Sequence, residues 1–214
     1  MIIDFHTHKS ETAEGIYAIR SFCITEINEP INIPHSIGLH PWNNPQSNWL
    51  ELLKIKIQNP NCLFIGECGL DKLKGDPIKT QIQRFKEQIT LSEEIHKPLV
   101  IHCVKSYNEI IEIHKEMQPT QKWIVHGFRG TTQLAQQLLA HNIYVSLGTY
   151  IANPKQTKMI TIVKQLGLGN FMLETDNNPT HIYDLYKSVA ETLETTLEEL
   201  TSKIDNLFVS LQKI

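Results

Sequence analysis

The chain lacks the features that would indicate a membrane or secreted protein. No apolar stretch approaches the roughly 20 residues that a membrane-spanning helix needs. The first residues contain no basic segment followed by an apolar signal core, so we expect a cytoplasmic protein. Four cysteines occur without a CxxC pair, which indicates reduced, packed thiols rather than disulfides.

A strong charge of either sign is also missing. The 214 residues carry a formal net charge of −3 with histidine neutral. This balance argues against a broad basic surface for nucleic acid, although a nucleic acid end could still enter a local cleft. The tryptophans Trp42, Trp49 and Trp123 are not interleaved with basic residues, so the sequence predicts no stacking platform for nucleobases.

Apolar runs of strand length recur along the chain and predict one α/β domain over residues 1–214. Helical patterns lie between several of these runs, which favours parallel strands with helical crossovers. The expected helices span about 78–97, 106–118, 131–141 and 196–211. The expected strands span about 2–6, 19–25, 35–39, 62–66, 98–102, 122–126, 142–147 and 170–174.

Two parallel architectures fit this pattern, an open doubly wound sheet and a closed barrel. No Gly-rich phosphate loop follows the first run, which disfavours a nucleotide-binding sheet. Up to eight strands fit, and the length lies near the lower limit for a barrel. We therefore predict a compact TIM-type (β/α) barrel.

Three of the expected helices carry specific local patterns. Ser106 with Glu109, and Thr196 with Glu199, have the spacing of capping boxes. The helix at 78–97 is expected to carry one apolar stripe, formed by Ile78, Ile82, Phe85 and Ile89. The helix at 196–211 is expected to send these side chains to a core: Leu197, Leu200, Ile204, Leu207, Phe208 and Leu211.

Five apolar runs finish on residues that can bind a metal ion. The first run, MIIDFHTH, places Asp4, His6 and His8 on one face of a strand, because side chains alternate. The later runs end in Glu67, His102, His126, Glu174 and Asp176. The carboxyl ends of barrel strands meet at one mouth, so we expect these residues to converge there. The four histidines, together with Glu67 and Asp176, exceed the needs of one tetrahedral zinc and suit two bridged divalent ions.

Two further residues are candidates for supporting roles. His40 lies near a strand end and is expected to support a ligand or to contact substrate. Asp71 could orient a ligand histidine or could cap a turn.

At these residues the sequence resembles the TatD family of metal-dependent hydrolases. The matching stretches are DFHTH, IGLHPW, IGECGLD, PLVIHC, VHGFRG and ETDNNP, in the family's order. The resemblance implies that His6 and His8 hold one ion together with Asp176, and that Glu67 bridges two ions. It implies that His102 and His126 hold the second ion, with Mg, Zn or Mn as the metal.

The resemblance also implies an activity. Members of this family are typically deoxyribonucleases, and some act as exonucleases on DNA ends. The chain departs from the family where Ser-Arg usually follows the histidine of VIHC, because Cys103 and Val104 stand there. Arg129 stands where a small residue is common. These departures concern substrate contacts, for which we expect Arg129, Lys105 and His40.

The leading hypothesis is a two-metal phosphodiesterase acting on DNA, in the manner of a 3′-end exonuclease, or on a small phosphodiester. Asp176 and Glu67 are the expected catalytic residues, with Asp176 collecting a proton from the attacking water. The same metal centre could serve a lactone, ester or amide hydrolase, or a non-catalytic metal-binding scaffold. A phosphatase of the PHP type is disfavoured, because FCITEIN stands where a Thr-Asp-His is usual. We expect a monomer without a membrane partner.

Overall fold

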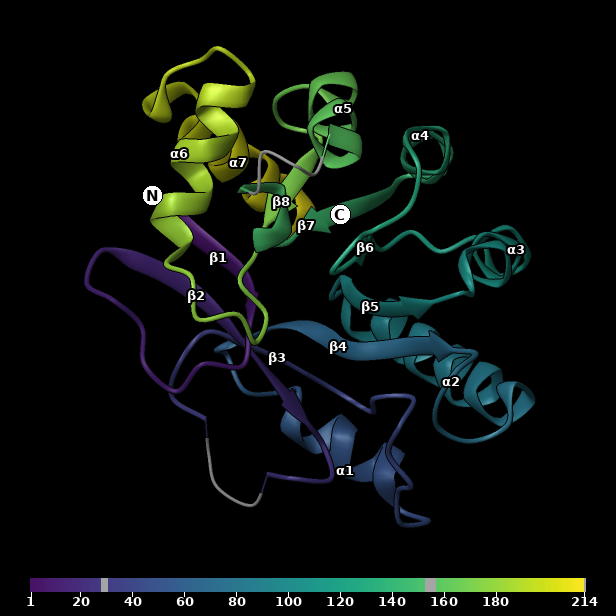
Figure 1. Cartoon of the computed structure of the whole chain (residues 1–214). Helices are drawn as coiled ribbons and strands as arrows, with labels where there is room; N and C mark the ends of the chain where they lie inside the picture. The colour runs from purple at the N-terminus through teal and green to yellow at the C-terminus, as the bar shows by residue number, and fades with distance from the viewer. Residues whose placement is uncertain (28–30, 153–156, 214) are drawn as a thin grey trace. The chain divides into compact units, whose positions relative to one another are not determined.

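Eight strands occur in the computed structural model, which describes residues 1–27, 31–152 and 157–213. Each lies within a few residues of a run that the sequence analysis identified (Figure 1). They are β1 (Ile2–Thr7), β2 (Ile16–Cys23), β3 (His35–Gly38), β4 (Cys62–Asp71), β5 (Leu99–Val104), β6 (Trp123–Val125), β7 (Ile143–Leu147) and β8 (Phe171–Leu173).

The order of the strands in the sheet is their order in the chain, from β1 to β8. Where a pairing register is defined, the neighbours are parallel. The first and last strands also meet, since Thr7 at the end of β1 bridges in parallel to Asp176 just beyond β8. This succession is that of a TIM-type (β/α) barrel, and the predicted fold class is confirmed.

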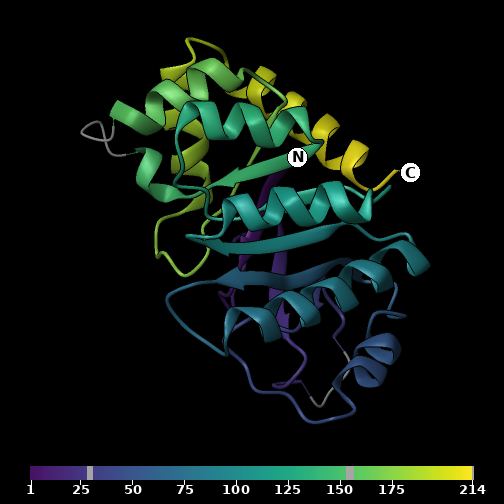
Figure 2. The ribbon, with the colours of Figure 1, turned by 90° about the vertical axis from the view of Figure 1, so that its right-hand side faces the viewer.

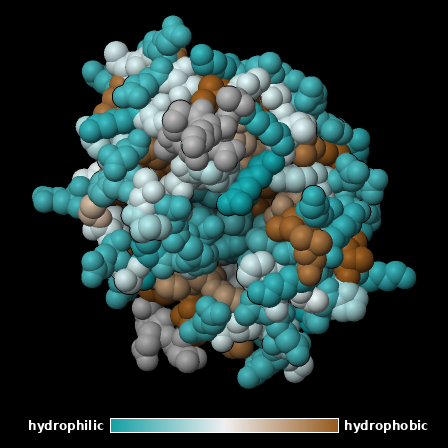
Figure 3. Space-filling view, viewed as in Figure 1, coloured by the Kyte–Doolittle hydropathy of each residue, from teal (hydrophilic) through white to brown (hydrophobic). Residues whose placement is uncertain are grey.

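Helices follow most of the strands, but the first three strands succeed one another without a helix in the described residues. The helices are α1 (Trp49–Lys56), α2 (Ile78–Ile95), α3 (Tyr107–Met117), α4 (Thr132–Ala140), the 3₁₀ helix η1 (Thr149–Ala152), α5 (Thr157–Leu166), α6 (Ile182–Thr192) and α7 (Leu197–Leu211). None of the described helices is long and apolar enough to cross a membrane. On the face in Figure 3, hydrophilic side chains predominate and apolar ones form small clusters.

The described residues form two compact units, the terminal unit (1–19 and 126–213) and the central unit (20–125). In the central unit β3, β4, β5 and β6 pair in parallel, and α2 lies along β4 (Figure 2). Phe85 and Ile89 of α2 are fully buried, as predicted. Ile78 and Ile82, earlier on the same stripe, are half-buried.

The buried face of α2 also carries two glutamines, Gln81 and Gln88. Gln88 accepts a hydrogen bond from the backbone N–H of Leu39 at 2.8 Å and donates to its carbonyl at 3.2 Å. Gln81 accepts from the N–H of Asp71 at 2.8 Å and donates to its carbonyl at 2.9 Å. Buried amides need such partners. As a result, α2 fixes the backbone just beyond β3 and at the end of β4.

The terminal unit contains β1, β7 and β8 with the helices α4 to α7. Thr196 caps α7 by accepting a hydrogen bond from the N–H of Glu199 at 3.1 Å, as the predicted capping box requires. The predicted apolar face of α7 is buried from Leu200 to Leu211, whereas Leu197, in the first turn, is only half-buried. Tyr186 of α6 ties this helix to β1, because its hydroxyl accepts from Ile3 N–H and donates to Ile3 C=O.

The capping box predicted at Ser106 is wrong. Ser106 is the N-cap of α3, but its hydroxyl donates to the carbonyl of Val104 at 2.9 Å instead of accepting from the helix. Glu109 forms an ion pair with Lys72. Ser106 and Glu109 therefore bind Val104 and Lys72 instead of the backbone N–H groups that a capping box would satisfy.

Candidate metal centre

A carboxylate and two imidazoles meet in the central unit, from just beyond β3 (His40), from within β4 (Glu67) and from within β5 (His102). Oε2 of Glu67 lies 3.4 Å from Nε2 of His40 and 3.4 Å from Nδ1 of His102. The ligand atoms of the three residues all lie within 4.8 Å of one another. Glu67 and His102 are buried, and His40 is half-buried. Nitrogen and carboxylate donors in this arrangement could hold a divalent cation.

His40 takes a different place from the one expected. We expected it to contact substrate or to support a ligand, but its imidazole lies beside the carboxylate of Glu67. The backbone N–H of Trp42 donates a hydrogen bond to Nδ1 of His40 at 3.2 Å. This contact turns Nε2 of His40 toward Glu67. We therefore count His40 among the candidate ligands.

Asp71 holds His102 from the other side. Its Oδ2 lies 3.3 Å from Nε2 of His102 and accepts a 2.7 Å hydrogen bond from the indole N–H of Trp42. Burial alone would raise the pKa of Asp71, but hydrogen bonds from the Leu73 backbone, Trp42 and His102 outweigh burial and lower it. Asp71 thus fills both roles expected for it: its Oδ2 orients a candidate ligand histidine, and its Oδ1 caps the following turn by accepting the N–H of Leu73 at 2.8 Å.

Close contact between β4 and β5 sets the position of His102. A Cβ atom at Gly69 would lie 2.2 Å from the carbonyl oxygen of His102, and the φ of Gly69 is +132°. Only glycine fits such a position without moving the neighbouring strand. Gly69 therefore lets β4, which carries Glu67, pack tightly against β5, which carries His102.

A second group of candidate ligands meets in the terminal unit. Oδ1 of Asp176 lies 3.7 Å from Nε2 of His8 and 4.0 Å from Nε2 of His6. Backbone pairing brings them together, because Asp176 N–H donates to His6 C=O at 2.9 Å and His8 N–H donates to Asp176 C=O at 3.2 Å. These are the three residues that the TatD resemblance implied for one ion.

His126 lies in the same group, with its ring centroid 4.3 Å from that of His6. Its Nδ1 is 3.5 Å from Oε1 of Glu174, which also accepts the N–H of Gly127 at 2.7 Å. Burial alone would raise the pKa of Glu174, but the hydrogen bond with His126 and the charges of His126 and His6 lower it. From the sequence, Glu174 was expected at a strand end but was given no role. Its position two residues before Asp176 was the available indication that it belongs to the site.

Asp4 supports this group through the backbone. It accepts hydrogen bonds from the N–H and the hydroxyl of Thr175, at 2.8 and 2.7 Å. Burial, the largest effect on it, raises the pKa of Asp4 to about 6. Asp4 thus fastens the residue that precedes Asp176.

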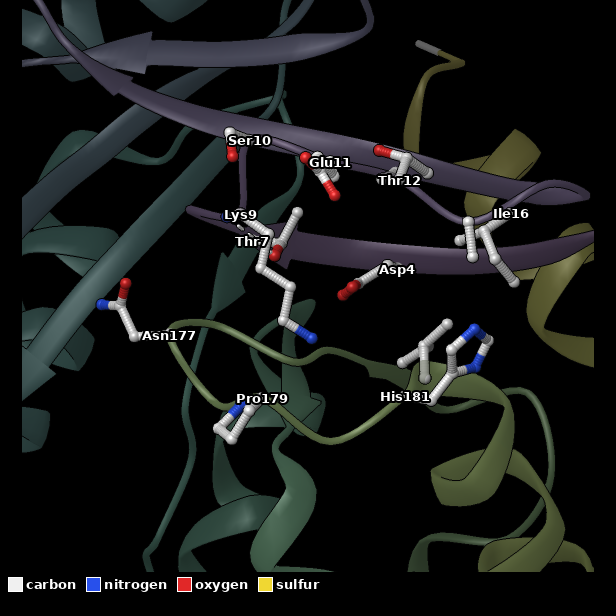
Figure 4. Close-up of a pocket in the computed structure, with 13 residues that line it drawn as sticks. Asp4, Thr7, Lys9, Ser10, Glu11, Thr12, Ile16, Asn177, Pro179 and His181 are labelled. Carbon is white, nitrogen blue, oxygen red and sulfur yellow. Dashed lines mark hydrogen bonds between the residues drawn. The ribbon is translucent and has the colours of Figure 1, made fainter.

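A solvent-open cavity of about 610 Å³ lies beside Asp4 (Figure 4). It separates the segment after β1 from the loop that carries Asn177 and Pro179. Lys9 reaches across and donates to the carbonyl of Thr180 at 2.8 Å. Lys9 thereby joins the loop that follows His8 to the loop that follows Asp176.

The two expected phosphate-binding residues differ in their surroundings. The guanidinium of Arg129, in the terminal unit, lies 4.7 Å from the ring centroid of Tyr150. The hydroxyl of Tyr150 donates to the carbonyl of Phe128, so this ring is held in place. Lys105, in the central unit, is exposed and has a φ of +56°.

Comparison with known proteins agrees with the resemblance seen in the sequence. The family model described as "TatD related DNase" matches residues 16–212. An uncharacterized metal-dependent hydrolase of Buchnera aphidicola is 30% identical over 193 residues, which cover 81% of this chain and 72% of that protein. The "3'-5' ssDNA/RNA exonuclease TatD" of Erwinia tasmaniensis is 27% identical over 148 residues, which cover 65% of this chain and 56% of that one. The chain spans 50% of a relative from Vairimorpha ceranae.

A solved structure gives the same fold. The TatD homolog YJJV from Escherichia coli matches with a TM-score of 0.84 and 20% identity, over 98% of this chain and 97% of that one. At this identity the likeness concerns the fold, and the family assignment rests on the sequence matches. The chain belongs to the TatD-related DNase family.

Proposed function

We propose that this chain is a divalent-metal-dependent phosphodiesterase that hydrolyses DNA, acting as an exonuclease from an end. The observation that carries the proposal is the Glu67 carboxylate standing 3.4 Å from the imidazoles of both His40 and His102. Family membership supports it, and so does the exonuclease name of the Erwinia relative.

The residues of both units fit divalent ions. In the central unit the donors are His40, Glu67 and His102. In the terminal unit they are His6, His8 and Asp176, with His126 beside them. Imidazole and carboxylate donors suit Zn²⁺ and Mn²⁺, and carboxylates suit Mg²⁺. When bound, a pair of such ions lowers the pKa of water and stabilises negative charge on phosphoryl oxygens.

The protein's own groups have distinct tasks in this proposal. Asp176, whose side chain is 44% exposed, is accessible to a water molecule and accepts its proton. Glu67 supplies a carboxylate with two charged oxygens, of which Oε2 faces His40 and His102. Asp71 orients His102, and Asp4 fastens Thr175 next to Asp176. Arg129 or Lys105 pairs with a phosphate oxygen of the substrate.

A carboxylic ester, lactone or amide would be polarised by the same metal centre, so a substrate comparison is the decisive test. Turnover of a short DNA oligonucleotide, bis-p-nitrophenyl phosphate and a panel of lactones is measured with one enzyme preparation. We expect hydrolysis of both phosphodiesters and release of mononucleotides from the oligonucleotide. Turnover of lactones alone would overturn the proposal in favour of the second hydrolase class, and bound metal without turnover would favour a scaffold. A single domain, a cytoplasmic location and a monomeric state stay predictions.

A further inference from the structure

Trp42 stands at the edge of the candidate metal centre with a large part of its surface in solvent. Its side chain is among the exposed large apolar ones, at 45%, whereas Trp49 and Trp123 are buried. The ring centroid of Trp42 lies 4.7 Å from that of His40 and 5.4 Å from that of His102. A flat, exposed aromatic surface therefore adjoins two candidate ligands.

The indole is fixed in its plane. Its N–H donates to Oδ2 of Asp71 at 2.7 Å, the same oxygen that lies 3.3 Å from His102. The backbone next to Trp42 is closely packed as well. A Cβ atom at Gly75 would lie 2.2 Å from the carbonyl oxygen of Pro41, the residue before Trp42. Arg84 ties the two loops together by donating to Asn43 C=O and to the carboxylate of Asp76. A preorganised ring loses little freedom when a ligand stacks on it.

A cation lies over the same ring. Nζ of Lys74 is 3.6 Å from the centroid of Trp42, and Lys74 is itself exposed. Lys74 comes from the loop after β4, so it lies far from Trp42 along the chain. That loop also carries Lys72 and lines a solvent-open cavity of about 580 Å³. The expectation of no stacking platform rested on the absence of basic residues beside Trp42 in the sequence, whereas the fold brings Lys74 over its ring.

We infer that the indole of Trp42 is a stacking platform for the nucleobase next to the scissile phosphate, with Lys74 as the cation that pairs with the adjoining backbone phosphate. The role rests on the proposed function. A base arriving at the ring takes the place of the Lys74 ammonium, which then turns to the phosphate. Combining an aromatic face with a neighbouring cation is the usual way in which proteins bind single strands without reading sequence.

The test removes the base and the ring separately. Wild type and Trp42→Ala are compared on two end-labelled single-stranded oligonucleotides that are identical except for an abasic terminal nucleotide. In wild type we expect loss of the terminal base to lower kcat/KM about five- to a hundredfold. In Trp42→Ala, kcat/KM on the normal strand is expected to fall by a similar factor, and loss of the base then costs little more.

Two variants separate stacking from structural effects. Trp42→Phe keeps a ring but loses the hydrogen bond to Asp71, and we expect it to retain most of the base dependence. Tyr183→Ala is the control, because it also removes an aromatic ring that has a lysine over it: Nζ of Lys187 lies 4.5 Å from the Tyr183 ring centroid. We expect this variant to behave as wild type. Equal losses in Trp42→Ala on the normal and the abasic strand would overturn the inference and assign Trp42 a structural role.

Binding gives a readout that does not depend on turnover. In a Glu67→Gln background, an added thymidine oligonucleotide should quench tryptophan fluorescence, since Trp42 is the exposed indole and the other two are buried. Binding detected by anisotropy without any quenching would overturn the inference. If wild type hydrolyses neither strand but hydrolyses lactones, the proposed function itself fails, an outcome distinct from hydrolysis that is indifferent to the base.

Discussion

The carboxylate of Asp71 lies 3.3 Å from Nε2 of His102, on the side of the ring opposite to Glu67. A histidine held in this way offers its other nitrogen to a metal ion in one fixed orientation. His102 therefore owes its position to the end of the neighbouring strand as well as to its own.

Replacing this carboxylate tests the arrangement. We expect Asp71→Asn to weaken divalent metal binding by about 10- to 100-fold, the usual effect of losing such a partner. Isothermal titration of the apoprotein with Zn²⁺ or Mn²⁺ measures it. Asp76→Asn is the control, because Asp76 lies in the same loop but pairs with Arg84. Equal metal affinity in Asp71→Asn and wild type would contradict the role of Asp71.

Arg129 and Lys105 differ in what they offer a phosphate. We expect Arg129→Ala to lower kcat/KM on a phosphodiester more than Lys105→Ala does. A planar two-pronged donor suits phosphate, and stacking on Tyr150 holds the guanidinium ready. Losing one charge-assisted hydrogen bond costs about 1.5–3 kcal/mol, or roughly tenfold to hundredfold in efficiency. Metal content should stay unchanged in both variants, and wild-type kinetics in Arg129→Ala would count against this assignment.

Glu93 links α2 to the segment before β6 and should make stability depend on pH. It accepts hydrogen bonds from the hydroxyl and N–H of Thr120 and from the N–H of Gln121. Burial, the largest single effect, raises the pKa of Glu93, but these hydrogen bonds together lower it below its ordinary value of 4.5. The stabilisation is therefore present above about pH 4.5 and is lost as the pH falls through the lowered pKa.

The corresponding experiment compares Glu93→Gln with its neighbour. We expect Glu93→Gln to lower the free energy of unfolding by about 1 kcal/mol at pH 7, because the carboxylate is partly solvated. The difference should be smaller at pH 3 than at pH 7, as urea titrations at both pH values would show. Glu94→Gln is the matched control, since Glu94 makes only a surface ion pair with Lys54 at 3.5 Å. A deficit of equal size at both pH values would refute the role of the charged form.

Much of the fold could be predicted because apolar runs mark buried parallel strands directly. The candidate ligands other than His40 could be named because each comes at the end of such a run, as His102 does after PLVI. Helices α1, α5 and α6 were not predicted. Helix α2 was predicted, but its buried glutamines Gln81 and Gln88 were not, since a pattern of apolar residues does not mark polar ones on the buried face.

The parts of the site that escaped prediction depend on contacts between distant segments. Nothing local distinguishes Trp42 from a packed tryptophan, and only folding brings Lys74 over its ring. Likewise, His40 follows a short strand, and its proximity to Glu67 depends on the pairing of β3 with β4. Glu174 has a partner only because His126 comes from another strand end.

Hydrolysis of an end-labelled DNA oligonucleotide by wild type and Glu67→Gln, each with and without divalent metal, tests the central claim most directly. An amide keeps the shape of Glu67 but lacks the charge that the candidate ligands His40 and His102 face. We predict mononucleotide release by wild type only when Mg²⁺, Mn²⁺ or Zn²⁺ is present, and a loss of roughly hundredfold or more in Glu67→Gln with metal restored. Unchanged turnover in Glu67→Gln, or in wild type stripped of metal, would contradict the account.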